Sequence, residues 1–554
     1  MFTIEELFHF LIHPILIGFL GGISALLFRF LILSFEKAIN YLHISSFFII
    51  IYPVVFIFSN YLIHKVLFEP SAITLDNIAK KIVFWRGGFS PLKSFFVLIL
   101  TSLNIAIGLP VGREAPIAKF GALLGEIYIK ISRIRNSIDI PLYLSTSVAS
   151  AIAATFNAPL AGIILGLEII IGKLNLYILL PLIVSTTTAT LISREFWGDF
   201  ASLKLPHLQF EDIYFFLVPI ISIFFALITL LLFYSFNFFK LLRLTLKERW
   251  YYVIGINGFI TALILKFVKE AQGIGYSYIF QLYNLKFPFL KVLAIFIAKL
   301  ITLILTIGSG LFGGLMSPSI FLGSFGGFAL GSLFKLGFSS IDPRVVALVG
   351  STAMLSGISR APLRSTILII ELSHSYQLLL PSLIAASFTS WLVAKFEPGS
   401  YFRRSLIQQG LNIDDPKVIQ LLKELNLENY VEKIPPLYSQ TSVTKAIKIF
   451  SKFHLRLLPV VNRKRELVGI VSIRDFMKIL GSFHNPSSKN VIEILNKTPV
   501  VLKNDSDLNE ILKVLSLAGT EYIPFVDKNN RYLGMLNLQK LFKDISIKLS
   551  QEKK

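Results

Sequence analysis

The longest uncharged stretch of the sequence runs from Leu300 to Phe334, and another long one runs from Ile213 to Phe239. About 20 apolar residues are enough for a helix to cross a bilayer, and both stretches exceed that length. Hydrophobic residues make up 54% of the 554 residues and charged residues only 16%, with a mean hydropathy of +0.69. These proportions exclude an ordinary soluble globular protein, and they predict a polytopic all-α membrane protein.

The stretch from Leu300 to Phe334 is too long for one span, and glycines and a proline interrupt it. Interrupted helices of this kind form the midplane binding sites of transporters. The interrupting residues are Gly308, Gly310, Gly313, Gly314 and Pro318. Helix-length apolar segments are predicted at 11–35, 45–67, 92–109, 116–131, 139–154, 159–172, 175–193, 212–239, 251–268, 287–307, 318–335, 343–357, 362–373 and 375–395.

A buried carboxylate is predicted within the stretch GLPVGREAPIAKFGA, residues 108–122, where Glu114 lies among mostly apolar residues. A carboxylate inside a membrane costs at least ~2.5 kcal/mol, so it is usually there for function. Gly112 permits a close backbone approach, and Pro116 suits the first turn of a helix. Glu114 therefore lies at a helix N-terminus, which holds either a carboxylate or a free anion that takes its place. The alternative is a glutamate that only caps the helix.

Two motifs recur at nearly the same offset. The pattern Gly-x3-Pro-x4-Gly occurs at 112–121 and again at 314–323. Ala-Pro-Leu, followed at one fixed spacing by a glutamate, occurs at 158–168 and again at 361–371. The sequence predicts two homologous halves, about 11–195 and 211–396, which we expect to be inverted with a site at their interface. The equivalent Glu168 and Glu371 are expected to make structural hydrogen bonds at helix ends.

The charge distribution limits the other classes of function. The net charge of +21 comes from basic clusters in short loops and the tail, such as 130–135, 240–249 and 403–404. The positive-inside rule predicts that these loops are cytoplasmic, and no soluble basic face with readout residues indicates nucleic-acid binding. The chain has no cysteine, and its eight histidines lack the spacing of a metal site or of a membrane-embedded hydrolase. The N-terminal stretch lacks a small-residue cleavage site, so no cleaved signal peptide is predicted.

After Phe396 the composition becomes that of a soluble domain. An amphipathic helix is predicted at 441–453, strands at 456–461 and 467–472, and a helix at 473–480. The sequence Leu-Pro-Val-Val at 458–461 matches Ile-Pro-Phe-Val at 523–526, and Gly469 matches Gly534 at the same offset. The tail is therefore predicted to be a tandem of two small α/β modules.

Four motifs in order resemble the CLC family of chloride channels and proton-coupled chloride exchangers. GREAP at 112–116 resembles the family's G-K/R-E-G-P motif, and GLMSP at 314–318 resembles its G-x-F-x-P motif. FNAPLAGIILGLE and SRAPLRSTILIIE look like its paired downstream helices, and the tail is similar to two CBS domains. The resemblance implies a transmembrane anion-transport domain at 1–404, a linker at 405–428, CBS domains at 429–484 and 485–546, and a basic tail at 547–554.

The resemblance also implies a site for chloride between opposed helix N-termini. Glu114 would be the gating glutamate, and the backbone N–H groups of Leu315 and Met316 would hold the central anion. Ser71 would be a further anion ligand, with an ordinary helix cap as the alternative, and either Phe402 or Tyr401 would take the place of the family's tyrosine. The pore motif consists of Gly112, Arg113, Pro116, Gly314 and Pro318.

Two residues depart from what the family or the membrane leads one to expect. Exchangers of the family carry a second glutamate where this chain has Ile169, and channels have an aliphatic residue there. This favours channel-like or weakly proton-coupled conduction, with proton/chloride antiport by another internal proton route as the alternative. Lys119, one turn beyond Glu114, is expected to extend its amino group to the membrane interface. Alternatively, it attracts anions toward the site.

The first CBS-like module carries GIVSIRD at 469–475, which resembles the family's nucleotide signature. Asp475 would bind ribose and Ser472 would lie near phosphate, so ATP, ADP or AMP is a candidate regulator, although a plain capping box is the alternative. The second module lacks the carboxylate. The resemblance further implies a homodimer in the plasma membrane with its CBS domains in the cytoplasm, no enzymatic activity, and neither a cofactor nor a metal.

Overall fold

The computed structural model describes most of the helical part of the chain and the strands of its tail. The described residues are 4–42, 48–62, 75, 78, 81–82, 87–134, 139–170, 176–198, 203, 211–246, 249–397, 426–446, 457–472, 490–493, 495, 501–506, 522–538, 540–541 and 544, without the side chains of 4–5, 48–49, 168–170 and 176. The chain divides into a helical unit, Met1–Ile82 with Gly87–Arg403, and a C-terminal unit that contains Arg404–Lys554. Each unit is described by itself.

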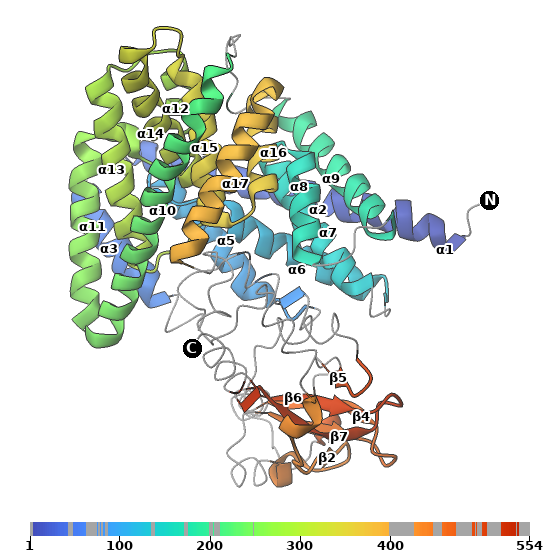
Figure 1. Ribbon diagram of the computed structural model, residues 1–554. Coiled ribbons are helices and arrows are strands. Elements are labelled where there is room, and N and C mark those ends of the chain that lie inside the picture. Colours follow the sequence, from blue (N-terminus) through green and yellow to red (C-terminus); the bar gives the residue numbers. More distant parts are fainter. Residues whose placement is uncertain are drawn as a thin grey trace. The chain divides into compact units, whose positions relative to one another are not determined.

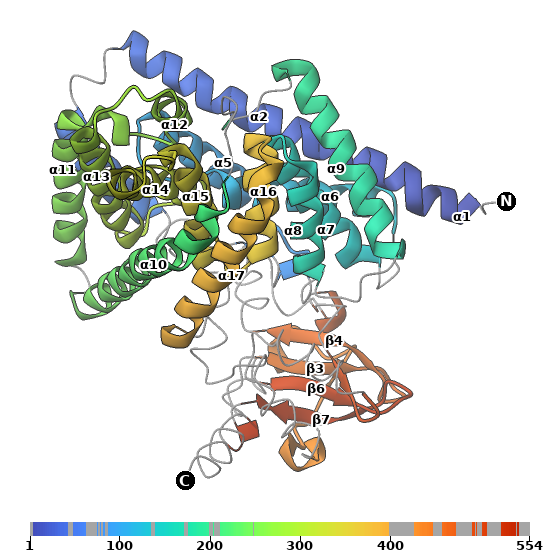
Figure 2. The same cartoon turned by 45° about the horizontal axis from the view of Figure 1, so that its top comes forward.

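The helical unit begins with a short helix and one π-helical turn and continues through two successive sets of helices (Figures 1 and 2). The first set comprises α1 (Ile4–Leu7), η1 (Phe8–Ile12), α2 (His13–Tyr41), α3 (Phe48–Tyr61), α5 (Pro91–Ala106), α6 (Glu114–Ile131), α7 (Asp139–Phe156), α8 (Pro159–Ile170) and α9 (Leu176–Trp197). The second comprises α10 (Ile213–Leu246), α11 (Trp250–Phe267), α12 (Tyr276–Tyr283), α13 (Phe289–Gly308), α14 (Met316–Gly337), α15 (Pro343–Ser359), α16 (Pro362–Ser373) and α17 (Leu379–Phe396).

The helices follow the offset of the sequence repeat. The first residues of α3 and α11 are as far apart in the sequence as the first residues of α6 and α14. Helices α8 and α16 are separated by nearly the same number of residues, at their first and at their last residues. The prediction of two homologous helical halves is therefore confirmed. Seven helices in the described part are long and apolar enough to cross a membrane, so the unit is a multi-pass membrane domain. Helix α12 was not predicted, because it is short and its sequence, YSYIFQLY, has no apolar run.

The long uncharged stretch breaks where its glycines predict. Helix α13 ends at Gly308, α14 begins at Met316, and Gly310 between them has a φ of +83°, a conformation that glycine adopts without strain. Non-helical backbone within a membrane needs partners from the protein. Asparagine amides supply two of them: Asn60 donates to the Ser309 carbonyl at 2.7 Å and Asn104 to the Phe312 carbonyl at 3.3 Å. Asn257 donates to the Ser309 hydroxyl at 2.9 Å.

Glycines hold α14 close to α15. A Cβ atom built on Gly323 would lie 2.3 Å from the Cα of Ser351, and one on Gly327 would lie 2.5 Å from the carbonyl oxygen of Val346. Gly331, one turn further on, faces Pro343 in the same way. Small residues at every fourth position let two membrane helices approach each other closely. This contact fixes the position of the helix whose N-terminus forms the site described below.

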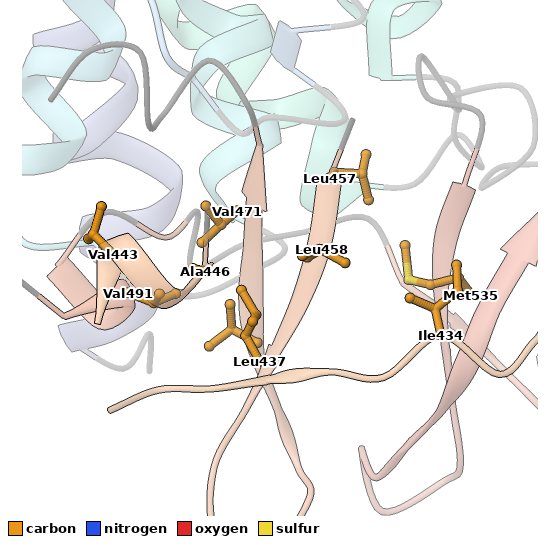
Figure 3. Packing of buried hydrophobic residues seen from close by; sticks show 10 residues of the cluster. Ile434, Leu437, Val443, Ala446, Leu457, Leu458, Val471, Val491 and Met535 are labelled. Carbon is orange, nitrogen blue, oxygen red and sulfur yellow. The ribbon is translucent and has the colours of Figure 1, made fainter. Parts of the chain in front are cut away.

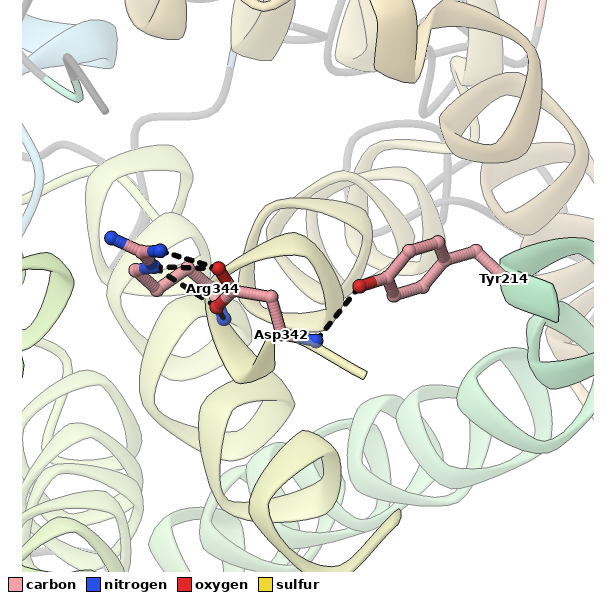
Figure 4. A network of polar contacts seen from close by, with 3 residues as sticks. All are labelled: Tyr214, Asp342 and Arg344. Atoms are coloured by element: carbon pink, nitrogen blue, oxygen red, sulfur yellow. Dashed lines mark hydrogen bonds and ion pairs between the residues drawn. The ribbon is translucent and has the colours of Figure 1, made fainter. Parts of the chain in front are cut away.

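A polar network of Tyr214, Asp342 and Arg344 caps the start of α15 (Figure 4). The Asp342 carboxylate accepts the Arg344 backbone N–H at 2.9 Å and caps the helix, while the Arg344 guanidinium donates to the same carboxylate. The backbone N–H of Asp342 donates to the Tyr214 hydroxyl at 2.8 Å. Because Tyr214 belongs to α10, this network ties the beginning of the second half to α15.

The C-terminal unit contains two small sheets. One has the order β1 (Val431–Glu432), β7 (Tyr532–Asn537), β6 (Tyr522–Val526) and β5 (Leu502–Lys503), and the other has the order β2 (Leu437–Tyr438), β3 (Leu457–Val461) and β4 (Leu467–Ser472). The pairs β5–β6 and β2–β3 are parallel, and the remaining pairs are antiparallel. Strands β2, β3 and β4 recur as β5, β6 and β7 at the single offset of the sequence repeat in the tail. The predicted tandem of α/β modules is therefore confirmed.

The core of this unit is aliphatic and is contributed by both modules (Figure 3). Its buried members are Ile434, Leu437, Val443, Ala446, Leu457, Leu458, Val460, Val471, Val491 and Met535. The modules also contact each other through equivalent residues, since Glu466 and Arg531, which hold the same place in the two modules, form an antiparallel β-bridge. The predicted helix at 473–480 and most of the one at 441–453 lie outside the described residues.

Candidate functional site

The two predicted pore motifs meet through their first glycines. The Gly112 N–H donates to the Gly314 carbonyl at 2.8 Å, and the Gly314 N–H donates to the Gly112 carbonyl at 2.7 Å. Reciprocal bonds between equivalent residues are what a local two-fold axis produces. Helices α6 and α14 both begin just after these glycines, so the pairing brings two helix N-termini together. Each end carries partial positive charge and N–H donors that have no acceptor within the helix.

The carboxylate of Glu114 occupies this place. Its side chain is 1% exposed, and its Oε1 atom accepts hydrogen bonds from the Ser317 backbone N–H at 2.8 Å and from the Ser317 hydroxyl at 2.5 Å. Glu114 is the first residue of α6, whereas Ser317 is the second residue of α14. The sequence suggested that the carboxylate binds the N-terminus of its own helix, α6. In the structure it binds the N-terminus of the opposite helix, α14. Pairing of the two motifs puts the second helix within its reach.

The other carboxylate oxygen lies against the paired glycines. A Cβ atom built on Gly314 would be 1.7 Å from Glu114 Oε2, and one built on Gly112 would be 2.2 Å from it. Within the part of the chain that the structure describes, Oε2 is buried and accepts no hydrogen bond. The absence of side chains at these two positions thus makes room for the carboxylate.

Arg113 adds positive charge without an ion pair. Its guanidinium carbon lies 4.7 Å from the ring centre of Phe156 and 5.5 Å from that of Tyr276, distances typical of cation–π contacts. Among the described residues no ion pair joins Arg113 to Glu114. The site therefore has two helix N-termini and one guanidinium around a single carboxylate. Such an arrangement attracts a small anion wherever the carboxylate is absent.

The remaining predicted pore residues lie at the same helix ends. Leu315 and Met316 are 1% and 2% exposed and stand at the start of α14, so their N–H groups have no acceptor within the helix. Pro116 and Pro318 are each the third residue of their helix, in the first turn as predicted for Pro116. The expectation that Lys119 reaches the membrane interface is wrong. Its side chain is 3% exposed because α6 packs against α2, α5 and α7.

Several predicted residues lie outside the described part of the chain. These are Ser71, Tyr401, Phe402 and Asp475, together with the side chains of Glu168 and Ile169. Ser472 is the last residue of β4 and is half-buried. Glu371 has the structural contact predicted for it: its carboxylate accepts the backbone N–H groups of Leu160 and Ala161, at 2.9 and 2.8 Å, at the start of α8.

Sequence reasoning did not assign a role to Ser317 or Tyr276. Ser317 occupies the second of the two positions that the G-x-F-x-P pattern leaves open, so only its hydroxyl, inside a predicted pore motif, could have drawn attention to it. Tyr276 belongs to the unpredicted helix α12. In the described residues no group of three or more His, Cys, Asp or Glu side chains could hold a metal ion.

Comparisons with known proteins identify the family. A model of the voltage gated chloride channel family matches residues 56–394, and the CBS domain model matches 428–482 and 491–547. The H(+)/Cl(-) exchange transporter ClcA of Vibrio campbellii is 27% identical over 349 residues, which cover 61% of this chain and 73% of that protein. A putative chloride channel protein, ClcB-like, of Ralstonia nicotianae is 28% identical over 305 residues, which cover 52% and 69%.

Solved structures share the fold. A eukaryotic CLC transporter superimposes with a TM-score of 0.66 at 16% identity and covers 97% of this chain and 98% of its own. A slow cyanobacterial Cl-/H+ antiporter superimposes with a TM-score of 0.62 at 19% identity, over 73% and 99% of the two chains. With the paired pore motifs, the duplicated helices and the tandem CBS modules, the family match leads to one conclusion. The chain belongs to the voltage gated chloride channel family, the CLC family of anion transporters and channels, and is not an enzyme.

Proposed function

We propose that the protein carries chloride and similar small anions across the membrane through a pore that Glu114 gates. The supporting observation is the buried Glu114 carboxylate, which is bonded to the N-terminus of α14 where an anion would bind. A carboxylate and a permeant anion compete for the same N–H donors. The neutral acid is held less strongly than the carboxylate, because the partial positive charge of a helix end stabilises the charged form.

The transport cycle follows from this competition. With Glu114 deprotonated, its carboxylate fills the site and closes the path. Once the carboxylate is protonated, the side chain leaves the site and an anion takes its place. A second, central anion is bound by the N–H groups of Leu315 and Met316. Ser71 and either Tyr401 or Phe402 are the further ligands proposed for this central anion. Neutral donors solvate an anion without the tight pairing of a lysine or arginine, so the ion also departs.

Replacement of Glu114 tests the proposal. Purified protein in liposomes should release chloride faster as the pH falls, and Glu114→Gln should be fast near neutral pH and nearly independent of pH, because the competing charge is gone. A glutamate that only capped its helix would, when replaced by Ala, cost ~1 kcal/mol of stability and leave the pH profile unchanged. A folded, conducting Glu114→Gln variant with the parent's pH dependence would remove Glu114 as the gate.

Coupling to protons is a second question, and two candidate functions compete. Ile169 has no titratable group, which favours channel-like or weakly coupled chloride conduction. The relatives named as H(+)/Cl(-) exchange transporters favour proton/chloride antiport, which would need another internal proton route. Recording chloride and proton movement together in the same liposomes decides between them. Little proton uptake, partly restored by Ile169→Glu, supports conduction, whereas a stoichiometric proton flux in the parent protein establishes exchange.

The remaining assignments concern assembly and regulation. We propose a homodimer in the plasma membrane with one pore in each chain and with the CBS pair on the cytoplasmic side. The basic loops support this orientation through the positive-inside rule. We also propose that adenine nucleotide binds the first CBS domain at Ser472 and Asp475 and regulates transport.

A further inference from the structure

The gate carboxylate is held by one residue, and that residue supplies two different donors. Ser317 gives both its backbone N–H and its hydroxyl to the same oxygen, Oε1 of Glu114. Ser317 is 0% exposed, and the contact joins residues 203 positions apart in the chain. The backbone donor comes with any residue at this position. The hydroxyl depends on the side chain, at the one position between Gly314 and Pro318 whose role the pore motif had left unassigned.

We propose that the Ser317 hydroxyl positions Glu114 in its closed place and sets the pH at which the gate opens. This inference rests on the proposed function of Glu114 and adds a residue to it. A hydrogen bond to a carboxylate favours the charged form over the neutral acid. With the hydroxyl present, the carboxylate stays bound to the α14 end down to a lower pH than the backbone N–H alone would permit.

The other charged and titratable groups around the gate do not replace this donor. Arg113 stacks against Phe156 and Tyr276 and makes no ion pair with Glu114 in the described part of the chain. Tyr276 of α12 lies within electrostatic range of both Arg113 and Glu114, and Arg29 of α2 lies within range of Arg113. Of these groups, Tyr276 acts on Glu114 through space, and its hydroxyl also lies next to the side chain of Ser317. Among the described side chains, only that of Ser317 donates a hydrogen bond to the carboxylate.

The size of the effect follows from the strength of the bond. A hydrogen bond to a charged group is strong enough to move a titration midpoint by about one to two pH units when it is lost. Ser317→Ala should therefore move the half-maximal flux about one to two units toward higher pH. It should also raise the chloride flux at neutral pH, since fewer gates are closed there.

Three variants in liposomes test this at a fixed chloride concentration. Ser317→Ala lacks the hydroxyl, and Ser317→Thr keeps one and should restore the midpoint of the parent. Ser332→Ala is the matched control on the same helix: its hydroxyl donates to the Phe328 carbonyl one turn earlier, away from the gate, so its midpoint should equal that of the parent. Thermal melting in detergent shows whether Ser317→Ala folds. If it does not, Ser317→Thr and Ser317→Cys are compared instead. Because a thiol is a weaker donor than a hydroxyl, Ser317→Cys should reach half-maximal chloride flux at a higher pH than Ser317→Thr.

The same measurements separate failure of this inference from failure of the proposed function. If the chloride flux of the parent has no pH dependence that Glu114→Gln removes, the proposed gating function of Glu114 is refuted. If that response is present but Ser317→Ala keeps the parent's midpoint, only the role of the hydroxyl is refuted. In a Glu114→Gln background, Ser317→Ala should leave the pH profile flat, because the hydroxyl then has no carboxylate to stabilise. If Ser317→Ala changes the pH dependence of chloride flux even in the Glu114→Gln protein, Ser317 acts on another group, and the inference is overturned.

Discussion

Gly112 and Gly314 bond to each other through both of their backbone groups, N–H to carbonyl in each direction, at 2.8 and 2.7 Å. They are equivalent residues of a duplicated sequence. A related pairing occurs in the C-terminal unit, where the equivalent Glu466 and Arg531 face each other in an antiparallel bridge. The hydrogen bonds there are made by their neighbours: the Leu467 N–H donates to the Asn530 carbonyl and the Tyr532 N–H to the Arg465 carbonyl, both at 2.9 Å. In the helical unit the bridge puts a carboxylate from one half, that of Glu114, onto a helix end of the other.

A methyl group at Gly314 should disturb the gate and spare the fold. Its Cβ would lie 1.7 Å from Oε2 of Glu114, which is the far end of a flexible side chain and is able to move away. Gly314→Ala should therefore prevent the carboxylate from seating and give high chloride flux at neutral pH with a weakened pH dependence. Liposome efflux between about pH 4 and pH 8 measures this.

The neighbouring Gly313 is the control for that variant. A Cβ there would meet the Cβ of Val111 at 2.2 Å, and a β-branched side chain next to the backbone has little freedom to move. Gly313→Ala should cost roughly 1–3 kcal/mol of stability through overpacking. A Gly314→Ala protein with normal gating, or one as unstable as Gly313→Ala, would contradict the position of the carboxylate.

Lys299 should be essential for stability. It is 0% exposed, and its ammonium donates to the carbonyls of Ala271 and Gly273 and lies 4.5 Å from the centre of the Phe321 ring. Lys299→Met leaves the buried carbonyl of Ala271 and the partly buried carbonyl of Gly273 without this donor, which should cost about 2–5 kcal/mol. The melting temperature in detergent should fall by several degrees.

Lys291 on the same helix offers the comparison. Its ion pair with Glu270 is partly exposed, so Lys291→Met should change the stability by less than about 1 kcal/mol. Equal melting temperatures for the two lysine variants would mean that the buried contacts of Lys299 contribute nothing. A measured difference would support its role in holding the segment that leads to Tyr276.

Glu371 should behave as a structural residue. Its carboxylate accepts two N–H groups at the start of α8, so Glu371→Ala should lose about 1–2 kcal/mol and Glu371→Gln, which keeps one acceptor, should lose less. Chloride flux in both folded variants should keep the parent's pH dependence. A flat pH profile in Glu371→Gln would instead indicate a second gating carboxylate.

Nucleotide binding to the CBS pair is testable on the full chain. Titration calorimetry of the detergent-solubilised protein with ATP, ADP or AMP should show a single ordinary site per chain, and Asp475→Ala should abolish it without changing the melting temperature in the absence of nucleotide. Asn537→Ala, in the second module, should bind as the parent does. The absence of heat with all three nucleotides would leave the modules as packing elements.

Local features of the sequence were enough to predict the helices and their duplication. Apolar length, Gly310 and Gly313 at the break, and prolines in first turns are properties of short segments, and a constant offset reveals the repeat without any coordinates. The same holds for β3 and β4 and their copies β6 and β7, which are apolar runs joined by polar turns. The two-residue strands β2 and β5 were not predicted. Helix α12 was missed because a short segment of mixed polarity carries no such local signal.

The sequence by itself thus determined the class of fold, the two helix ends and the residue, Glu114, that stands at one of them. Only the tertiary structure decided which helix end the carboxylate binds. That choice depends on the pairing of Gly112 with Gly314, which brings Ser317 to a residue 203 positions away. Packing of α6 likewise buried Lys119, against the local expectation for a lysine in a membrane helix. Local sequence records what a segment prefers, whereas the partner of a buried polar group is fixed by which segments the fold brings together.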